Sequence, residues 1–207
     1  MVQINPPPPE NLPQPVIYSV PGRTPFLRLF DPASRSAQAL TFRRYGPLHR
    51  FDHHREKNGE PDEDKERGIL YAGESISGCI VEVFGDTRVI EVGTWELALL
   101  ETQREVNLLD LRGDGAMKAG TIAGICKDTN QCLSQLWSRY FYENECIYGP
   151  IDGLLFGNAH NDEMALALYE RAESGLLCLM ECPLSDNALR TEVQLTAKDY
   201  GLTVEPY

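Results

Sequence analysis

Long apolar runs are missing from this sequence of 207 residues, and none approaches the roughly 20 residues that a membrane-spanning helix needs. Residues 1–15 also lack the basic start and apolar stretch of a secretory signal. The length suits one well-buried domain and is too short for two ordinary ones. We therefore expect a cytoplasmic protein of one domain that does not contact a membrane.

Positive charge is scarce, because 19 Lys and Arg stand against 31 Asp and Glu, a formal net charge of −12. This balance argues against a nucleic-acid partner, since phosphate contacts require a basic surface. Residues 21–55 are the exception, with seven arginines and two aspartates. An arginine-rich segment on an acidic chain suits a compact anionic ligand. The alternative is a set of solvated surface charges.

Common catalytic and metal-binding signatures are also absent. The sequence has no G-x-G-x-x-G, no P-loop, no H-E-x-x-H and no G-x-S-x-G. Of its four histidines, His49, His53 and His54 are close together beside Asp52, which is not a well-spaced ligand set. The six cysteines lack paired C-x-x-C spacing and are expected to be reduced. We predict no metal site.

The pattern along the chain predicts an α+β domain. Six prolines in residues 1–15 indicate a flexible, extended arm without a buried pattern, so the folded domain is expected over 16–207. Residues 56–67 are polar and predict an exposed acidic loop. Helices are expected over 75–84, capped by Ser75 or Ser77, over 95–102, and over 128–142. For 75–84 a strand is the alternative, because its β-branched residues also fit one. Short strands or apolar runs are expected at residues 16–18, 26–30, 69–72, 106–111, 151–156, 165–169 and 176–180.

The third of these helices should begin with a capping box formed by Asp128 and Gln131. Its spacing predicts one apolar face that packs into the core. The residues of this face are Leu133, Leu136, Trp137 and Tyr140.

Three short stretches hold the polar side chains of chemical interest. Residues 48–52 place Arg50 beside Phe51, and residues 68–84 place Tyr71 eleven positions before Glu82. The third stretch, residues 151–158, ends at an asparagine. Glu82 is the most informative, because a carboxylate among apolar neighbours is costly to bury without a partner. The alternative is that Glu82 lies on the solvent-exposed face of an amphipathic element.

The order and spacing of these stretches resemble the RES domain family over roughly residues 24–171. Its members have an arginine on an early strand, then Gly-Arg-aromatic-Asn/Asp, apolar-Tyr, an Ala-rich segment ending in Glu, and Asp-Gly-Ile before an aromatic residue and a serine. The corresponding residues here are Phe26–Leu29, His49–Asp52, Leu70–Tyr71, Glu82 and Asp152–Phe156. Two positions depart from the pattern, since His49 replaces the usual glycine and Asn158 the expected serine.

The resemblance implies a fold like that of ADP-ribosyltransferases, with mixed or antiparallel sheets and flanking helices in a single α+β domain. It also implies an enzyme that consumes NAD as its substrate by cleaving the nicotinamide–ribose bond. The class is an NAD glycohydrolase, a phosphorylase or an ADP-ribosyltransferase, whose acceptor is water, phosphate or a protein. The family includes toxins that are usually restrained by an antitoxin of the Xre type, so the resemblance also implies such a partner.

The resemblance also suggests roles for individual residues. Arg28 and Arg50 would bind the pyrophosphate, because guanidinium groups bind phosphate oxygens bidentately. Glu82 would stabilise positive charge on the ribose. Tyr71 and Phe51 would pack against the nicotinamide or orient the ribose, and Asn158 would hold the nicotinamide end or the ribose by hydrogen bonds.

Two alternatives remain open. In the first, the chain is a catalytically degenerate RES-like module that binds NAD or another protein, and Asn158 marks the lost chemistry. In the second, it is an unrelated α+β protein whose motifs match by chance, in which case Arg50, Tyr71 and Glu82 would not converge in the fold.

Overall fold

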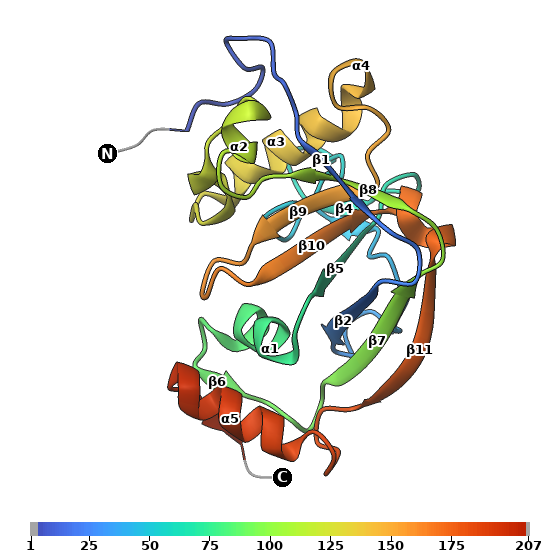
Figure 1. Ribbon diagram of the computed structural model, residues 1–207, viewed down its shortest axis with the longest axis vertical. Coiled ribbons are helices and arrows are strands. Elements are labelled where there is room, and N and C mark those ends of the chain that lie inside the picture. Colours follow the sequence, from blue (N-terminus) through green and yellow to red (C-terminus); the bar gives the residue numbers. More distant parts are fainter. Residues whose placement is uncertain (1–3, 206–207) are drawn as a thin grey trace.

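Eight strands form one curled sheet in the computed structural model, which describes residues 4–205 (Figure 1). Strands β8 and β9 pair in parallel and the other neighbours are antiparallel. The order across the sheet is β1 (Ile17–Val20), β8 (Val106–Asp110), β9 (Gly153–Gly157), β10 (Met164–Tyr169), β5 (Ile69–Gly73), β2 (Pro25–Phe30), β7 (Glu96–Thr102) and β11 (Leu176–Pro183).

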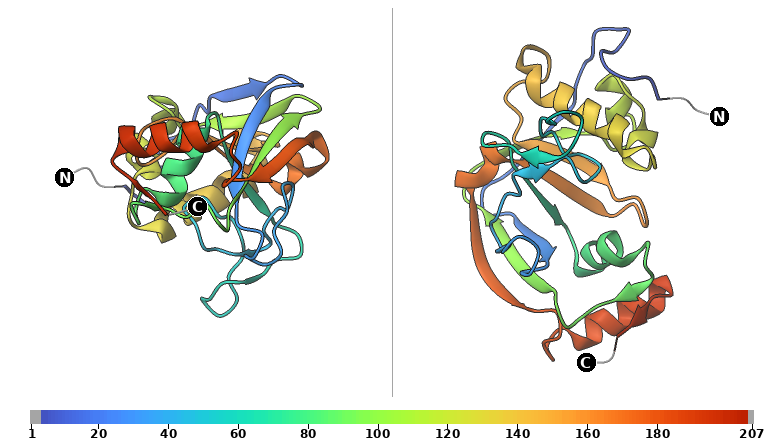
Figure 2. Two further views of the ribbon diagram at one scale, coloured as in Figure 1. Left: turned by 90° about the horizontal axis from the view of Figure 1, so that it is seen from below. Right: turned by 180° about the vertical axis from the view of Figure 1, so that it is seen from behind.

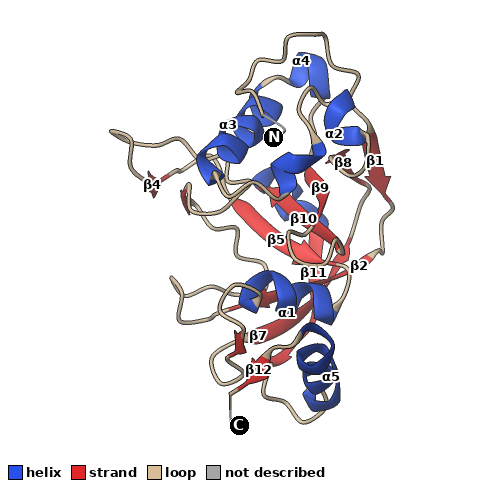
Figure 3. Ribbon diagram, turned by 90° about the vertical axis from the view of Figure 1, so that its left-hand side faces the viewer, coloured by secondary structure: helices blue, strands red, loops and turns tan. Residues whose placement is uncertain are grey.

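Helices gather at the two ends of the molecule, with the sheet between them (Figure 3). One end holds α2 (Gly115–Lys118), the 3₁₀ helix η1 (Ala123–Cys126), α3 (Gln131–Glu143) and α4 (Glu145–Tyr148). The other end holds α1 (Ile76–Phe84) and α5 (Arg190–Tyr200). The remaining elements are β3 (Tyr45–Gly46) with β4 (Asp62–Glu63), β6 (Val89–Ile90) with β12 (Thr203–Val204), and η2 (Glu170–Gly175).

Three apolar clusters hold these parts together. One fills the concave side of the curled sheet, a second lies between the sheet and α3, and the third joins α1 to α5. Seen from behind, α1 lies between α5 and the sheet (Figure 2). The position of α1 therefore depends on packing from both sides.

Helix α1 follows β5 directly, next to the place where β5 and β2 pair most weakly. Strands β2 and β5 pair through a single register position, Leu27 opposite Gly73. A Cβ placed on Gly73 would lie 2.9 Å from the Cys79 Sγ, so only glycine lets α1 approach the strand this closely. This close contact fixes where the side chains of α1 project.

The structure confirms the α+β architecture and the helix expected over 75–84. Ser75 is its N-cap, and the Ser75 Oγ accepts a hydrogen bond of 2.8 Å from the Gly78 backbone N–H. The helix expected over 95–102 is wrong, because this segment is strand β7 between β2 and β11. Sheet neighbours on both sides outweigh the helical tendency of its leucines and alanine.

The expected capping box is also wrong. Helix α3 begins at Gln131 with Asn130 as its N-cap, and Asp128 Oδ1 instead accepts from the Asn130 backbone N–H at 2.9 Å. Its buried face differs from the expected one, because Leu136 is 43% exposed whereas Ser134 is buried. Helix α5 was not expected from the sequence.

Residues 4–15 lie against α2, η1 and α3, and all of them are half-buried or exposed, in keeping with the absence of a buried pattern in their sequence. The Trp137 Nε1 donates to the Asn5 carbonyl at 2.9 Å, and the Gln14 backbone N–H donates to the Lys118 carbonyl at 2.8 Å. Proline rings pack over Gly120, where φ is +94°. This segment is therefore held by both its backbone and its rings.

The polar segment 56–67 is only partly exposed, which corrects the expectation of a fully exposed loop. Residues 56–60 are exposed, but Asp64 and Arg67 are buried. Asp64 accepts from Arg55, and Arg67 Nη1 donates to the His53 carbonyl at 2.9 Å. These partners offset the cost of burying charge. No helix within residues 4–205 is long and apolar enough to span a membrane.

Asp152, immediately before β9, provides a test of the packing between β8 and β9. It is 5% exposed and accepts from both terminal nitrogens of Arg104, at 3.0 and 2.7 Å, and from the Asn107 backbone N–H at 2.9 Å. Asp152→Asn replaces an acceptor with an amide donor and should lower the free energy of unfolding by about 1–3 kcal/mol. Urea titration measures this change.

Asp114→Asn is the matched control, because Asp114 is exposed and pairs with Lys118 on the surface at 2.8 Å. Exposed pairs contribute little, so this variant should unfold with the wild type. Equal midpoints for the wild type and Asp152→Asn would contradict the structural role of Asp152.

Candidate active site

A buried aspartate fixes the turn that contains Arg50. Asp52 is fully buried, and it accepts from Arg43 Nη2 at 2.8 and 2.7 Å and from the backbone N–H groups of Leu48 and His49 at 2.5 and 3.0 Å. Burial favours the protonated acid, but the charge of Arg43 and the two amides outweigh it and hold the pKa of Asp52 below its usual value. The turn is therefore closed around an ionised carboxylate.

Tyr71 on β5 joins the sheet to this turn. Its hydroxyl donates to Asp52 Oδ1 at 2.9 Å and accepts from the Phe51 backbone N–H at 3.1 Å. Burial and the negative charge of Asp52 raise the pKa of Tyr71 well above its usual value, so the phenol stays protonated. The ring of His49 lies edge-on to the Tyr71 ring, with centroids 5.9 Å apart. The ring of Tyr71 is half-buried.

Glu82 lies on α1, and the charge of the same turn acts on it. Arg50 donates to the Asp128 carbonyl and is close enough to Glu82 to influence its ionisation. The Glu82 side chain is exposed, yet the surrounding protein desolvates its carboxylate enough to raise its pKa. The charges of His160 and Arg50 and the backbone N–H of Ala159 oppose this shift by stabilising the ionised form. Arg50 is thus linked to Tyr71 through the turn and to Glu82 through its charge.

Phe51 lies in the core and has no exposed surface. Its ring is 4.7 Å from the ring of Phe156, and its carbonyl accepts a hydrogen bond of 2.6 Å from the Ser138 Oγ. The aromatic side chain therefore supports the turn from behind, where a ligand does not reach it.

Arg28 lies apart from this group. Its side chain is on the same face of β2 as Phe30, whereas α1 packs against the opposite face. Its Nη1 donates to the carbonyls of Ala39 and Thr41 at 3.0 and 2.9 Å. Burial and the nearby charge of Arg43 lower the pKa of Arg28 to about 10. These contacts give Arg28 a structural role between β2 and the following loop.

Asn158 is 1% exposed, and its amide closes the turn between β9 and β10. Its Oδ1 accepts from the backbone N–H groups of His160 and Asn161 at 3.0 and 2.9 Å, and its Nδ2 lies 3.5 Å from the Gly78 carbonyl on α1. Asn158 therefore shapes the loop beside Glu82 from a buried position. His160, which the sequence analysis did not assign to the site, is an exposed residue of that loop, and its charge favours the ionised form of Glu82. The signal that the sequence offered for His160 was that histidine is rare in this chain, which has four.

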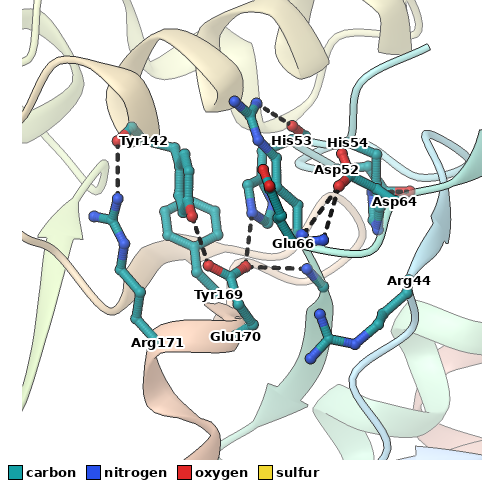
Figure 4. Close-up of polar contacts among 12 residues, drawn as sticks. Arg44, Asp52, His53, His54, Asp64, Glu66, Tyr142, Tyr169, Glu170 and Arg171 are labelled. Atoms are coloured by element: carbon teal, nitrogen blue, oxygen red, sulfur yellow. Dashed lines mark hydrogen bonds and ion pairs between the residues drawn. The ribbon is translucent and has the colours of Figure 1, made fainter. Parts of the chain in front are cut away.

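A second polar cluster supports the histidines that follow Asp52 (Figure 4). The ring of His53 lies between those of Tyr142 and Tyr169, with centroids 4.5 and 4.3 Å away. Its Nε2 is 3.1 Å from Glu170 Oε2, and the Tyr142 hydroxyl donates to Glu170 Oε1 at 2.6 Å. Burial lowers the pKa of His53 to about 4, so the ring is neutral at pH 7 and its Nε2–H donates to the glutamate.

Metal ligation has no candidate among residues 4–205, where no group of three or more His, Cys, Asp and Glu is placed to hold an ion. His54, like His53, is buried, and its Nε2 is 2.9 Å from the Arg43 carbonyl. The two histidines thus belong to the packing behind the turn.

Comparison with known proteins identifies the family. A model of the RES domain matches residues 25–185. The chain belongs to the RES domain family. A solved structure with a similar fold is the crystal structure of the M. tuberculosis MbcT–MbcA toxin–antitoxin complex, with a TM-score of 0.54 and 16% sequence identity over 86% of this chain and 92% of that chain. At this identity the likeness concerns the fold alone. The search of curated proteins found no match.

The buried pair of His53 and Glu170 predicts acid sensitivity of this RES domain. The pKa of His53 is lowered from 6.5 to about 4 in the folded protein, so the unfolded chain takes up the proton first as the pH falls. The stabilisation is complete above pH 6.5 and is lost towards pH 4, by up to about 3 kcal/mol. The pKa of Glu170, lowered to about 2, adds a further loss below about pH 4.5.

His53→Gln cannot titrate, and its amide can still donate to Glu170. Its free energy of unfolding should therefore vary less than that of the wild type between pH 6.5 and 4, when both are measured by urea titration. Parallel pH dependence in the two proteins would show that His53 is not the titrating group.

Proposed function

We propose that this RES domain cleaves the nicotinamide–ribose bond of NAD in a site formed by Arg50, Tyr71 and Glu82. The observation that supports this most is that the charge of Arg50, on the turn closed by Asp52, favours the ionised form of Glu82 on α1 and so lowers its pKa. A carboxylate and a guanidinium from separate elements thus lie within electrostatic reach, where a compact dianion and a developing cation can be bound together. Membership of the RES domain family supports the choice of NAD.

In the reaction the bond between the ribose C1′ and the nicotinamide N1 breaks. Its electron pair passes to N1, so nicotinamide leaves as a neutral molecule and positive charge develops on the ribose. An ionised carboxylate beside the ribose stabilises that charge. Glu82 has this role, and Arg50 and the Ala159 N–H favour its ionised form. The acceptor then bonds to C1′ and releases a proton.

Arg50 would hold the pyrophosphate. One of its terminal nitrogens donates to the Asp128 carbonyl, which orients the guanidinium and leaves its other N–H groups for phosphate oxygens. Tyr71 would pack its half-buried ring against the ribose or the nicotinamide. It would use the ring because its hydroxyl is already hydrogen-bonded to Asp52 and to the Phe51 backbone N–H. The buried Arg28, Phe51 and Asn158 would act by supporting these residues.

A degenerate NAD-binding module is the second candidate, and Asn158 favours it. A serine in this position would offer a hydroxyl, whereas the amide of Asn158 is committed to the turn of the loop. In this case NAD binds and stays intact.

We further propose that the chain is the toxin of a toxin–antitoxin pair in the cytoplasm. The solved structure with a similar fold is a toxin bound to its antitoxin, and NAD is supplied inside the cell. An antitoxin of the Xre type is the expected partner. In the transferase case a protein would be the acceptor of ADP-ribose.

The test is to incubate the purified protein with NAD, with and without phosphate, and to follow free nicotinamide. Glu82→Gln keeps the shape of the side chain but removes its charge, and it should lower kcat by about 100-fold or more. Arg50→Lys should raise the KM for NAD about tenfold, because a single ammonium cannot replace the guanidinium fork.

Glu192→Gln, on the exposed surface of α5, is the matched control and should leave both constants unchanged. Dependence on phosphate would identify a phosphorylase. Release of nicotinamide at the wild-type rate by Glu82→Gln would refute the proposed role of Glu82. Binding of NAD without nicotinamide release, also with protein acceptors present, would favour the degenerate module.

A further inference from the structure

The loop between β9 and β10 is fixed at both ends. At its start, Asn158 is buried and bonds to the loop backbone. At its end, the Glu163 carboxylate accepts from the side chains of Ser75, Ser77, Asn161 and Tyr200, and the last three bonds measure 3.0, 2.7 and 3.1 Å. Burial opposes ionisation of Glu163, but these donors outweigh it and lower its pKa. The loop is therefore tied to both α1 and α5.

Between these anchors, Ala159 and His160 face one side of α1. Glu82 lies in the last turn of α1, and Asp86 lies in the turn that follows the helix, next to its C-cap Gly85. The Ala159 N–H stabilises the ionised Glu82, and the His160 Nε2 is 3.8 Å from Asp86 Oδ1. A Cβ placed on Gly85 would lie 2.7 Å from the His160 ring, so the imidazole rests directly on the helix backbone.

The exposure of His160 argues against a purely structural role. Its side chain is 28% exposed, and that of Asp86 is 96% exposed, so their contact at 3.8 Å adds little stability. A loop anchored by buried Asn158 and by Glu163 does not need this contact to keep its shape. It presents an imidazole to solvent beside the carboxylate that would face the ribose.

We propose that His160 is a further residue of the NAD site and that its imidazole forms a hydrogen bond to a hydroxyl of the nicotinamide ribose. This inference rests on the proposed NAD site and names the group that its β9–β10 loop contributes. His160 thereby supplies, from the exposed side of the loop, the polar side chain that the buried Asn158 does not present.

The ligands ADP-ribose and ADP test this contact without any reaction. Both contain the pyrophosphate, but only ADP-ribose contains the ribose that would bond to His160. His160→Ala should weaken ADP-ribose binding about 5- to 10-fold, the loss of one hydrogen bond, and leave the Kd for ADP unchanged. Isothermal titration calorimetry on the full chain measures both constants.

Two further variants distinguish a lost hydrogen bond to the ribose from a general loss of ligand binding. His160→Gln retains a hydrogen-bonding group and should recover part of the affinity for ADP-ribose. Arg50→Lys should weaken both ligands, because it acts on the phosphates they share. Thermal unfolding must show that each variant remains folded.

The possible failures are distinct. If the wild type binds ADP-ribose and His160→Ala binds it equally well, the role of His160 is wrong while the NAD site stands. Equal weakening of ADP and ADP-ribose by His160→Ala also overturns the contact with the ribose. If the wild type binds neither ligand and releases no nicotinamide, the NAD site itself is wrong, and the assignment of His160 falls with it.

Discussion

The buried carboxylate of Asp52 is the interaction on which the arrangement around Arg50 depends. It receives two bonds from Arg43, two from backbone amides of its own turn and one from Tyr71. A charge without solvent contact is tolerated only when its hydrogen-bonding capacity is filled. The turn, the arginine and the sheet must therefore keep one mutual geometry. Arg50 projects from this turn, so its direction is set before any ligand binds.

Glu82, on which the charge of Arg50 acts, is positioned by separate packing. Helix α1 is pressed against β5 at Gly73 and is covered on its other side by α5. The loop between β9 and β10 is tied to α1 through Asn158 and Glu163. The carboxylate and the arginine thus come from two rigid parts of one domain. Groups held in place in this way can stabilise a developing charge well, because they need to move little when the reaction occurs.

Local patterns in the sequence predicted much of the fold but less of the site. The helix capped by Ser75 and the strand that contains Tyr71 followed from short-range spacing. Strand β7 did not, because its leucines fit a helix equally well and only its sheet partners decide the outcome. Motif spacing singled out Arg28 together with Arg50, yet long-range contacts bury one and leave the other half-exposed. The position of His160 beside α1 depends on anchors 80 or more residues apart, which no local pattern records.

The most direct test of the account is a crystal structure of the Glu82→Gln variant with NAD, since this change should slow cleavage and preserve the shape of the site. We predict that the pyrophosphate lies at Arg50 and that the nicotinamide ribose lies between position 82 and His160. NAD bound elsewhere on the domain, or its nicotinamide ribose turned away from α1, would contradict it.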